Sequence, residues 1–437
     1  MITLPEIQQE RPPWKAKTRL KTRPQVMLFR VSLGLCFAVG IFLRLPPAVF
    51  VDAPKVIRQI HLEPAFKGVG FDENLYRKYV ESLTKVGLTN YPSIVDHYVE
   101  VQKTLPGSIL PPVRFLYIFA GYIWHSLFGT QALASLHAVA SLFSIMTLLL
   151  SAGMAWRLKG PSFGLGVAAL MAFAPTQIHM SQHALVDGFF TFWALLCLWL
   201  LWENLQAPGR VSWTVLYAAS LCLLVLTKEN AFFVYASLLA ILGLNRWLRF
   251  GSITRELVIA TAVGPLLGVV VLVFLAGGLE NLFLTYRLSV SKNYQLQYAI
   301  LTGDGPWHRY LVDLLLVSPI VLLLAIGSAF RLDRTQKPEL LVTVFIVGSY
   351  LIMCNLKYGM NLRYANMWDM PLRLLALGRL VFIYRSCGRY RNPLVILSVM
   401  GVCMCELREY AALCVQFPLY ELVPEGLLRA LHILKTR

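Results

Sequence analysis

Long apolar stretches alternate with short polar segments along most of this chain of 437 residues. Most of these stretches approach the ~20 residues that a helix needs to cross the hydrocarbon core of a bilayer. The pattern predicts an all-α polytopic membrane protein. About eleven transmembrane helices are predicted, over residues 26–44, 131–156, 161–176, 186–204, 211–227, 230–246, 257–277, 309–330, 339–356, 370–386 and 392–407.

The stretch 112–128 is also apolar, but its length is marginal and it is rich in Tyr, Trp and Phe, as helices at the membrane surface are. Four basic connectors decide its position: Arg157/Lys159, Arg246/Arg249/Arg255, Arg331/Arg334/Lys337 and Arg385/Arg389/Arg391. If 112–128 crossed the bilayer, all four connectors would lie opposite the basic N-terminus. If it lies in the interface, all four are cytoplasmic, as the positive-inside rule favours. We therefore expect 112–128 not to span.

This threading divides the chain into five parts. Residues 1–25 form a basic cytoplasmic N-terminus, and 26–44 form a first transmembrane helix that is retained, since no small-residue cleavage site follows it. Residues 45–130 form an extracytoplasmic loop with juxtamembrane helices. Residues 131–407 contain about ten further transmembrane helices, and 408–437 form an extracytoplasmic tail.

Composition supports the membrane assignment. Hydrophobic residues make up 57% of the chain and charged residues only 14%, whereas soluble proteins contain roughly 25% charged residues. The mean hydropathy is +0.61. A net charge of +17 is explained by cytoplasmic loops that face anionic lipid, so membrane lipid is the expected partner and nucleic acid is not. The eight cysteines show neither a disulfide framework nor metal-ligand spacing.

Two adjacent acids, Asp72 and Glu73, lie in the polar outer segment, within Gly70-Phe71-Asp72-Glu73-Asn74-Leu75-Tyr76. They are either ordinary loop acids or part of a catalytic site. The predicted topology places further polar residues on the same side: His179, His183, Asp187, Lys228, Glu229, Arg287, Lys292, Asp304, Lys357, Arg363 and Asp369. A single charge of this kind often only snorkels at a helix end. Because charges at membrane depth are costly and commonly functional, their collection on one face favours a functional site.

Three of these residues, His179, His183 and Asp187, are spaced four apart, so one helix would stack them on one face. Such a set could bind a metal, but no further ligand motif is visible, and a hydrogen-bonded cluster is favoured. Lys228 offers a point charge for a phosphate, and Arg363 offers a planar fork that binds phosphate oxygens bidentately.

Several short motifs occur in a characteristic order across residues 26–385. They are Phe71-Asp72-Glu73 with Tyr76, Pro111-Pro112 before the aromatic helix that ends Leu127-Phe128-Gly129, Arg157-Leu158-Lys159-Gly160, Pro175 before His183-Ala184-Leu185-Val186-Asp187, Leu226-Thr227-Lys228, and Leu362-Arg363-Tyr364 with Pro371. In this order they resemble the membrane-embedded glycosyltransferases that use polyprenyl-phosphate sugars. These are the protein O-mannosyltransferases and the lipid A aminoarabinose transferases, which have the GT-C fold.

The resemblance implies roles for individual residues. Asp72 matches the catalytic acid of these enzymes, Lys228 and Asp187 match residues that line the donor site, and Arg363 matches a late Arg-Tyr motif. The chain departs from the family pattern at Leu110, where relatives often have Lys or His, and near His137, where they often have Arg.

The remaining candidates complete the expected site. Glu73 is expected to form the catalytic pair with Asp72, either by positioning Asp72 or by binding an interfacial ion. Arg114 and Arg287 are reserve donors for the phosphate. Tyr76 and His183 are expected to line the site.

The expected function is transfer of a sugar from a polyprenyl-phosphate donor to a lipid, protein or glycan acceptor at the extracytoplasmic face of a bacterial inner membrane. Asp72 would be the general base. No cofactor is required, and a divalent metal is left open. The alternative is a non-enzymatic flippase or transporter of lipid-linked sugar. Transporters commonly contain internal repeats and helices broken in mid-span, and neither is clear from the sequence.

Cysteine-accessibility labelling tests the predicted topology. Cysteines introduced at Gly160 and Ser252 are expected to react only with reagents that reach the cytoplasm, because both positions lie in basic connectors. Labelling of either position from outside would mean that 112–128 crosses the membrane.

Overall fold

The chain folds entirely into helices and connecting segments. The computed structural model describes residues 23–434, and this range contains no strand. The prediction of an all-helical membrane protein is confirmed. Most of the predicted basic N-terminus, residues 1–22, and the last three residues of the tail lie outside the described range.

A helix, or a pair of consecutive helices, occurs at each predicted span. The bundle consists of α1 (Arg23–Arg44), α6 (Ala132–Lys159), α7 (Pro161–Ala172) with α8 (Pro175–Gln182), α9 (Val186–Gln206), α10 (Val211–Val225), α11 (Ala231–Leu248), α12 (Arg255–Leu275), α15 (Arg309–Val317) with α16 (Pro319–Ala329), α17 (Lys337–Met353), α18 (Asp369–Ile383) and α19 (Arg391–Tyr410). Within the described range, five helices are long and apolar enough to cross a membrane, or six if the bent pair α7–α8 is one span. The number eleven therefore stays a prediction.

The expected uninterrupted helix over 161–176 is wrong. α7 and α8 are bent by 57° at the break between them, where Pro175 begins α8 and lacks the N–H that a continuous helix would use. The carbonyl groups freed at the end of α7 are bound by the fully buried guanidinium of Arg44. Its Nη2 donates to Met171 O at 2.6 Å and its Nη1 to Ala172 O at 3.1 Å. The break is therefore hydrogen-bonded inside the bundle.

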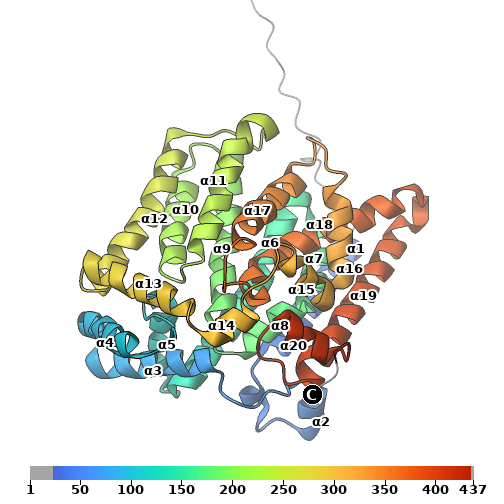
Figure 1. Ribbon diagram of the computed structural model, residues 1–437. Helices are drawn as coiled ribbons and strands as arrows, with labels where there is room; N and C mark the ends of the chain where they lie inside the picture. Colours follow the sequence, from blue (N-terminus) through green and yellow to red (C-terminus); the bar gives the residue numbers. More distant parts are fainter. Residues whose placement is uncertain (1–22, 435–437) are drawn as a thin grey trace, which may run out of the picture.

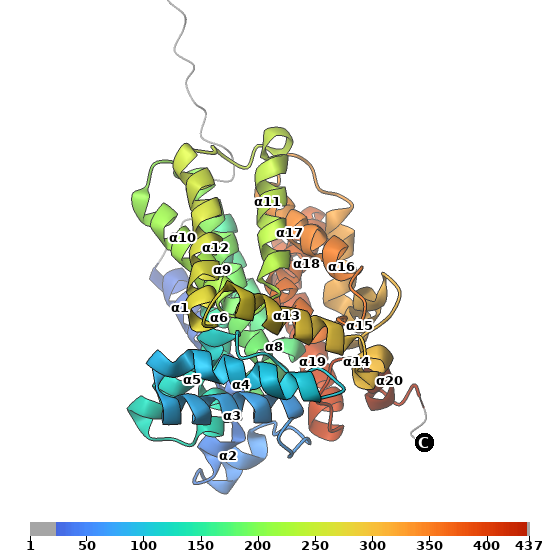
Figure 2. The same ribbon diagram turned by 60° about the vertical axis from the view of Figure 1, so that its left-hand side comes forward.

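Short helices cover one end of the bundle. They are η2 (Pro47–Phe50), α2 (Lys55–Ile60), α3 (Phe71–Val86), η3 (Leu88–Asn90), α4 (Tyr91–Thr104) and α5 (Phe115–Phe128). Figure 2 shows α3, α4 and α5 lying across the lower end of the upright helices. α5 has only 14 residues, which suits the predicted interfacial helix, although its position relative to the membrane stays a prediction.

The connector between the predicted spans 257–277 and 309–330 and the predicted tail both contain helices of their own. The connector 278–308 contains α13 (Leu279–Asn293) and α14 (Gln297–Thr302). Beyond α19 the chain continues through η7 (Ala411–Gln416) to α20 (Pro424–Ala430), and Figure 1 shows α20 beside α15. The remaining short helices are η4 (Leu362–Trp368), η5 (Tyr384–Ser386) and η6 (Gly388–Tyr390).

The basic connectors contact one another at the opposite end. Lys159 forms an ion pair with Glu339, and Lys337 donates a hydrogen bond to Leu248 O. Arg331 and Arg385 both lie over the ring of Phe382. These contacts join the four connectors that the positive-inside argument grouped together, so α3 and the basic connectors lie at opposite ends.

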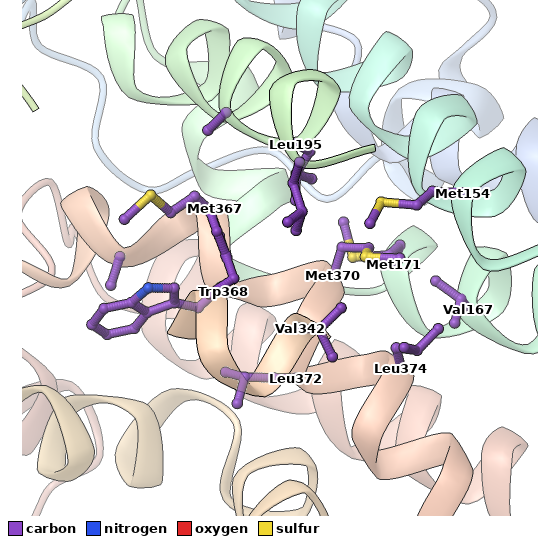
Figure 3. Packing of buried hydrophobic residues seen from close by; sticks show 14 of the residues in the cluster. Met154, Val167, Met171, Leu195, Val342, Met367, Trp368, Met370, Leu372 and Leu374 are labelled. Atoms are coloured by element: carbon purple, nitrogen blue, oxygen red, sulfur yellow. The ribbon is translucent and has the colours of Figure 1, made fainter. Parts of the chain in front are cut away.

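Two hydrophobic cores meet where α8 is followed by α9. The larger core fills the bundle, and Figure 3 shows its centre, where Trp368 and Met370 pack near Leu195 of α9 and Met171 of α7. The smaller core joins α3, α4 and α5 to the ends of α6, α9, α10 and α12. The α8–α9 junction contributes side chains to both cores, so it is held from both sides.

A buried polar network anchors η4 to the bundle. Arg373 of α18 donates a hydrogen bond to Asp369 at 2.9 Å and is paired with Glu406 of α19. Gln177 of α8 donates to the other oxygen of Asp369 at 2.9 Å and also to Asn366 of η4. These residues are all at least 97% buried, so the two carboxylates depend on Arg373 for neutralisation.

Replacing Arg373 by Leu is expected to reduce the free energy of unfolding by about 3–5 kcal/mol, the cost of removing one partner from a buried ion pair. Thermal unfolding in detergent or nanodiscs would measure the loss. Arg391→Leu is the matched control, because Arg391 is exposed at the start of α19, and it should change stability little. Equal stability of the two variants would contradict the role given to the network.

Candidate functional site

The predicted catalytic acid lies at the covered end of the bundle, at the start of a helix. Asp72 is the second residue of α3, which follows the N-cap Gly70. An acid in the first turn is favoured by the helix dipole. The side chain of Asp72 is 14% exposed, and its Oδ2 accepts a hydrogen bond from Arg363 Nη2 at 2.7 Å. Two residues that are 291 positions apart in the sequence thus form the centre of the site.

Arg363 is buried and surrounded by acids. It belongs to η4, whose N-cap Asn361 accepts a hydrogen bond from the Arg363 backbone N–H. Besides Asp72, its guanidinium lies 3.4 Å from a carboxylate oxygen of Glu421 and 3.7 Å from one of Asp187. Burial alone would lower the pKa of Arg363, but the charge of Glu421, followed by those of Tyr364, Asp72 and Asp187, raises it above its ordinary value. Arg363 is therefore a permanent cation.

Lys228 is the second cation of the site. It lies in the connector between α10 and α11 and donates a hydrogen bond to Asp187 Oδ1 at 2.6 Å. Its Nζ lies 3.9 Å from the centroid of the Tyr364 ring. Burial lowers the pKa of Lys228 from 10.5 to about 8, although the charge of Asp187 opposes this shift. At neutral pH the ammonium group is still mainly protonated.

Glu73 connects the start of α3 to the α8–α9 junction. Its Oε2 accepts a hydrogen bond from Gly70 N, and its Oε1 accepts one from Ala184 N, both at 2.6 Å. His183 and His137 lie 3.5 and 3.7 Å from Oε1. Burial alone would raise the pKa of Glu73, but these hydrogen bonds and charges lower it to about 2. Its oxygens are committed to this connection, so the geometry suits a residue that positions Asp72.

Arg114, a predicted reserve donor for phosphate, is already occupied. At the N-terminus of α5 it donates a hydrogen bond to Tyr76 Oη at 2.9 Å and two to Glu229, one of them at 3.0 Å. Glu229 follows Lys228 in sequence, so Arg114 and Tyr76 support the connector that carries Lys228. The other reserve, Arg287, is exposed on α13, and none of its contacts in the described range joins it to Asp72, Lys228 or Arg363.

The expected helical stack of His179, His183 and Asp187 is wrong. α8 ends at Gln182, His183 to Leu185 are extended, and Asp187 belongs to α9. His179 and Asp187 therefore lie on different helices, α8 and α9, which are separated by the extended junction. The two histidine rings still lie 4.6 Å apart, but Asp187 points to Lys228. In residues 23–434, no group of three His, Cys, Asp or Glu side chains is arranged to hold a metal ion.

Sequence reasoning missed the contribution of the C-terminal segment. Glu421 pairs with Arg363 and accepts a hydrogen bond from Asn361 Nδ2 at 2.5 Å. The ring of Tyr420 lies 5.1 Å from that of His183 and fills the space above Gly70. The segment joins η4 through the hydrogen bond from Leu362 N to Leu422 O. The sequence feature that could have indicated this contribution is the polar pair Tyr420-Glu421 in an otherwise apolar stretch.

The site therefore combines a partly exposed carboxylate with two buried cations. Asp72 can accept a proton from a substrate, and Lys228 and Arg363 can stabilise negative charge on a leaving group. A cavity of about 320 Å³ is lined in part by the C-terminal segment. It is lined by Leu301, Thr302, Asp304, Gly305, Pro306, His308, Arg309, Val312, Val423, Pro424 and Glu425. Of these, Asp304 was predicted to lie on the same face as Asp72, but none was assigned a role in the expected site.

Known structures with a similar fold are membrane glycosyltransferases. ArnT from Cupriavidus metallidurans, in its apo state, matches with 15% sequence identity and a TM-score of 0.52, over 93% of this chain and 75% of that chain. The oligosaccharyltransferase of Archaeoglobus fulgidus, tethered with an acceptor peptide containing the NVT sequon, matches with 12% identity and a TM-score of 0.58, over 88% of this chain and 55% of that chain.

The same oligosaccharyltransferase in complex with Zn and sulfate matches with 13% identity and a TM-score of 0.58, over 87% and 52% of the two chains. This chain thus spans about half the length of the oligosaccharyltransferase. No protein-family model and no curated protein matches the chain. At these identities the comparisons establish the fold, and the chain has the GT-C fold.

The low pKa of Glu73 predicts how stability depends on pH. The folded protein binds this proton less tightly than the unfolded chain, so ionised Glu73 stabilises the fold above about pH 4.5, and the effect is lost as the pH falls towards 2. Glu73→Gln should therefore lower the free energy of unfolding by about 3 kcal/mol at pH 7.

The difference between wild type and Glu73→Gln should shrink as the pH is lowered below about 4.5, which thermal unfolding at a series of pH values would measure. Glu81→Gln is the control on the same helix, because the Glu81 side chain is 48% exposed. A Glu73→Gln difference that stays constant with pH would contradict the assigned ionisation.

Proposed function

We propose that this protein is an integral membrane glycosyltransferase that moves a sugar from a polyprenyl-phosphate donor to an acceptor hydroxyl or amide at the end of the bundle where Asp72 lies. One observation supports this function above the others. Asp72 is held by the buried guanidinium of Arg363, and Asp187 links this guanidinium to the second buried cation, Lys228, in a chain with the GT-C fold.

Asp72 is proposed to be the general base. Its Oδ2 is bound by Arg363, and the described residues donate no hydrogen bond to its Oδ1. That oxygen can accept the proton of the acceptor group as the group attacks the anomeric carbon. The bond from the anomeric carbon to the phosphate oxygen then breaks, a bond to the acceptor forms, and the configuration is inverted.

The two cations are proposed to bind the phosphate as it leaves. The bond electrons pass to the phosphate oxygen, whose negative charge grows during the reaction. Arg363 can present a planar fork to two phosphate oxygens, and Lys228 can present a point charge. Because both cations are buried, the surrounding low dielectric strengthens their interaction with the phosphate. The two cations can stabilise the charge without a metal, and the proposed mechanism is also compatible with a bound divalent metal.

Glu73 is proposed to position Asp72 rather than react. Its carboxylate joins the N–H groups of Gly70 and Ala184, which fixes the first turn of α3 against the α8–α9 junction. This junction also presents Asp187 to Lys228. His183, which lies near Glu73 Oε1, and Tyr76, which is bound to Arg114, are proposed to support the walls of the same site.

A flippase or transporter of lipid-linked sugar is the second candidate. The break between α7 and α8 favours it, because transporters commonly contain broken helices near their substrate sites. The two functions differ in the fate of the donor. A flippase moves the lipid-linked sugar across proteoliposomes unchanged, whereas a transferase consumes it.

The Asp72→Asn variant tests the proposed chemistry. The amide preserves the shape of the side chain but cannot accept a proton, so transfer should fall by about a hundred- to ten-thousand-fold. Expression, membrane insertion and donor binding should stay close to wild type. The measurement is transfer of radiolabelled sugar per folded molecule in reconstituted membranes.

Asp52→Asn is the matched control, because Asp52 is an exposed acid in the same outer segment, and it should transfer at the wild-type rate. Glu73→Gln should have a milder effect than Asp72→Asn, since an amide keeps part of a positioning role. Full transfer by Asp72→Asn would refute the enzyme mechanism built on this residue.

A further inference from the structure

Three carboxylates surround the single guanidinium of Arg363. Asp72, Asp187 and Glu421 approach it at 2.7, 3.7 and 3.4 Å. The other cation in contact with this group is Lys228, which pairs with Asp187. Three negative and two positive charges give the cluster a net charge of −1 when all are ionised. An anionic substrate group that enters this cluster would be repelled by its net negative charge unless one carboxylate leaves.

Glu421 is the carboxylate best able to leave. Its side chain is 19% exposed, compared with 14% for Asp72 and 4% for Asp187. Asp72 accepts a hydrogen bond from Arg363 Nη2, whereas Glu421 faces Nη1 without forming one. Swinging Glu421 into solvent therefore breaks an ion pair but no hydrogen bond to Arg363, and the exposed carboxylate regains water.

Arg363 has unpartnered donors, and one of them, Nη1, faces Glu421. The Nε and Nη1 atoms of the buried Arg363 donate no hydrogen bond within the described range. The hydroxyl group of Tyr420, the residue before Glu421, is also buried without a partner. Burial and the charge of Asp72 raise the pKa of this hydroxyl, so it remains a donor. Unpaired buried donors cost free energy, and an anion that accepts a hydrogen bond from Arg363 Nη1 would recover part of that cost.

The backbone that carries Glu421 can stay in place during this exchange. Leu422 O accepts a hydrogen bond from Leu362 N, and Tyr420 O is 3.0 Å from His179 Nε2. Leu419 and Leu422 are buried in the main core. The Glu421 side chain is tethered by one hydrogen bond, from Asn361 Nδ2, so its rotation needs no rearrangement of the segment.

We propose that Glu421 occupies the place of the substrate's anionic group on Arg363, and that a lipid phosphate binds by displacing the Glu421 carboxylate. This inference rests on the proposed function, because it takes the lipid phosphate as the ligand. After displacement, two carboxylates and two cations remain, and the phosphate replaces the negative charge that left. Glu421 thereby keeps Arg363 neutralised in the empty site and weakens binding of the phosphate by competition.

Replacing Glu421 by Gln tests the competition. The amide keeps the size of the side chain and an oxygen for Asn361 but removes the charge, so the variant should bind undecaprenyl phosphate in nanodiscs on the order of tenfold more tightly than wild type. Binding of the neutral alcohol undecaprenol should not change. Glu421→Asp withdraws the carboxylate from Arg363 and should also bind the phosphate more tightly, which provides a second variant if Glu421→Gln folds poorly.

The matched control is Glu425→Gln, four residues further on. The Glu425 side chain is 63% exposed and pairs with Arg429. The Glu425→Gln variant should therefore bind undecaprenyl phosphate with the same affinity as wild type. If wild type binds the phosphate but both Glu421 variants bind it equally or more weakly, the displacement is refuted while the proposed function stands. If the Glu421 variants bind undecaprenyl phosphate and undecaprenol more tightly by the same factor, Glu421 does not compete with the phosphate, and the inference is refuted. If wild type binds no lipid phosphate, the proposed function and this inference both fail.

Discussion

A buried guanidinium that must be neutralised is the constraint on which this end of the molecule depends. Arg363 is only 6% exposed, and an unpaired charge at such a position would be very costly. Its acids come from the start of α3, the start of α9 and the C-terminal segment. The surface helices, the bundle and the tail therefore meet at one side chain, and the position of each is linked to that of the others.

The break after α8 makes this convergence feasible. A continuous helix through His183 and Asp187 would place their side chains on one stripe of the bundle. The extended residues between α8 and α9 instead expose the Ala184 N–H to Glu73 and turn Asp187 towards Lys228. Because the junction belongs to both hydrophobic cores, the polar contacts are built on packed backbone. The site thus obtains its geometry from a defect in helical regularity.

The sequence predicted the helices well because bilayer-length apolar runs are a strong pattern, and it proposed Asp72, Asp187, Lys228 and Arg363 individually as site residues. It could not pair them, since ion pairs between residues hundreds of positions apart leave no local periodicity. It mistook the register of His179 and Asp187, because the sequence after Pro175 contains no feature that fixes where α8 ends. It missed Glu421 because a short segment after the last span looks like an ordinary tail until its packing is known.

The two halves of the Asp72–Arg363 ion pair are synthesised far apart in time. At ~5–20 residues per second, the 291 residues between them require about 15 to 60 s of translation. During that interval the chain that contains Asp72 exists without the guanidinium that later pairs with it. The cluster of ion pairs around Arg363 is consequently completed late in biogenesis, after most of the bundle has been synthesised.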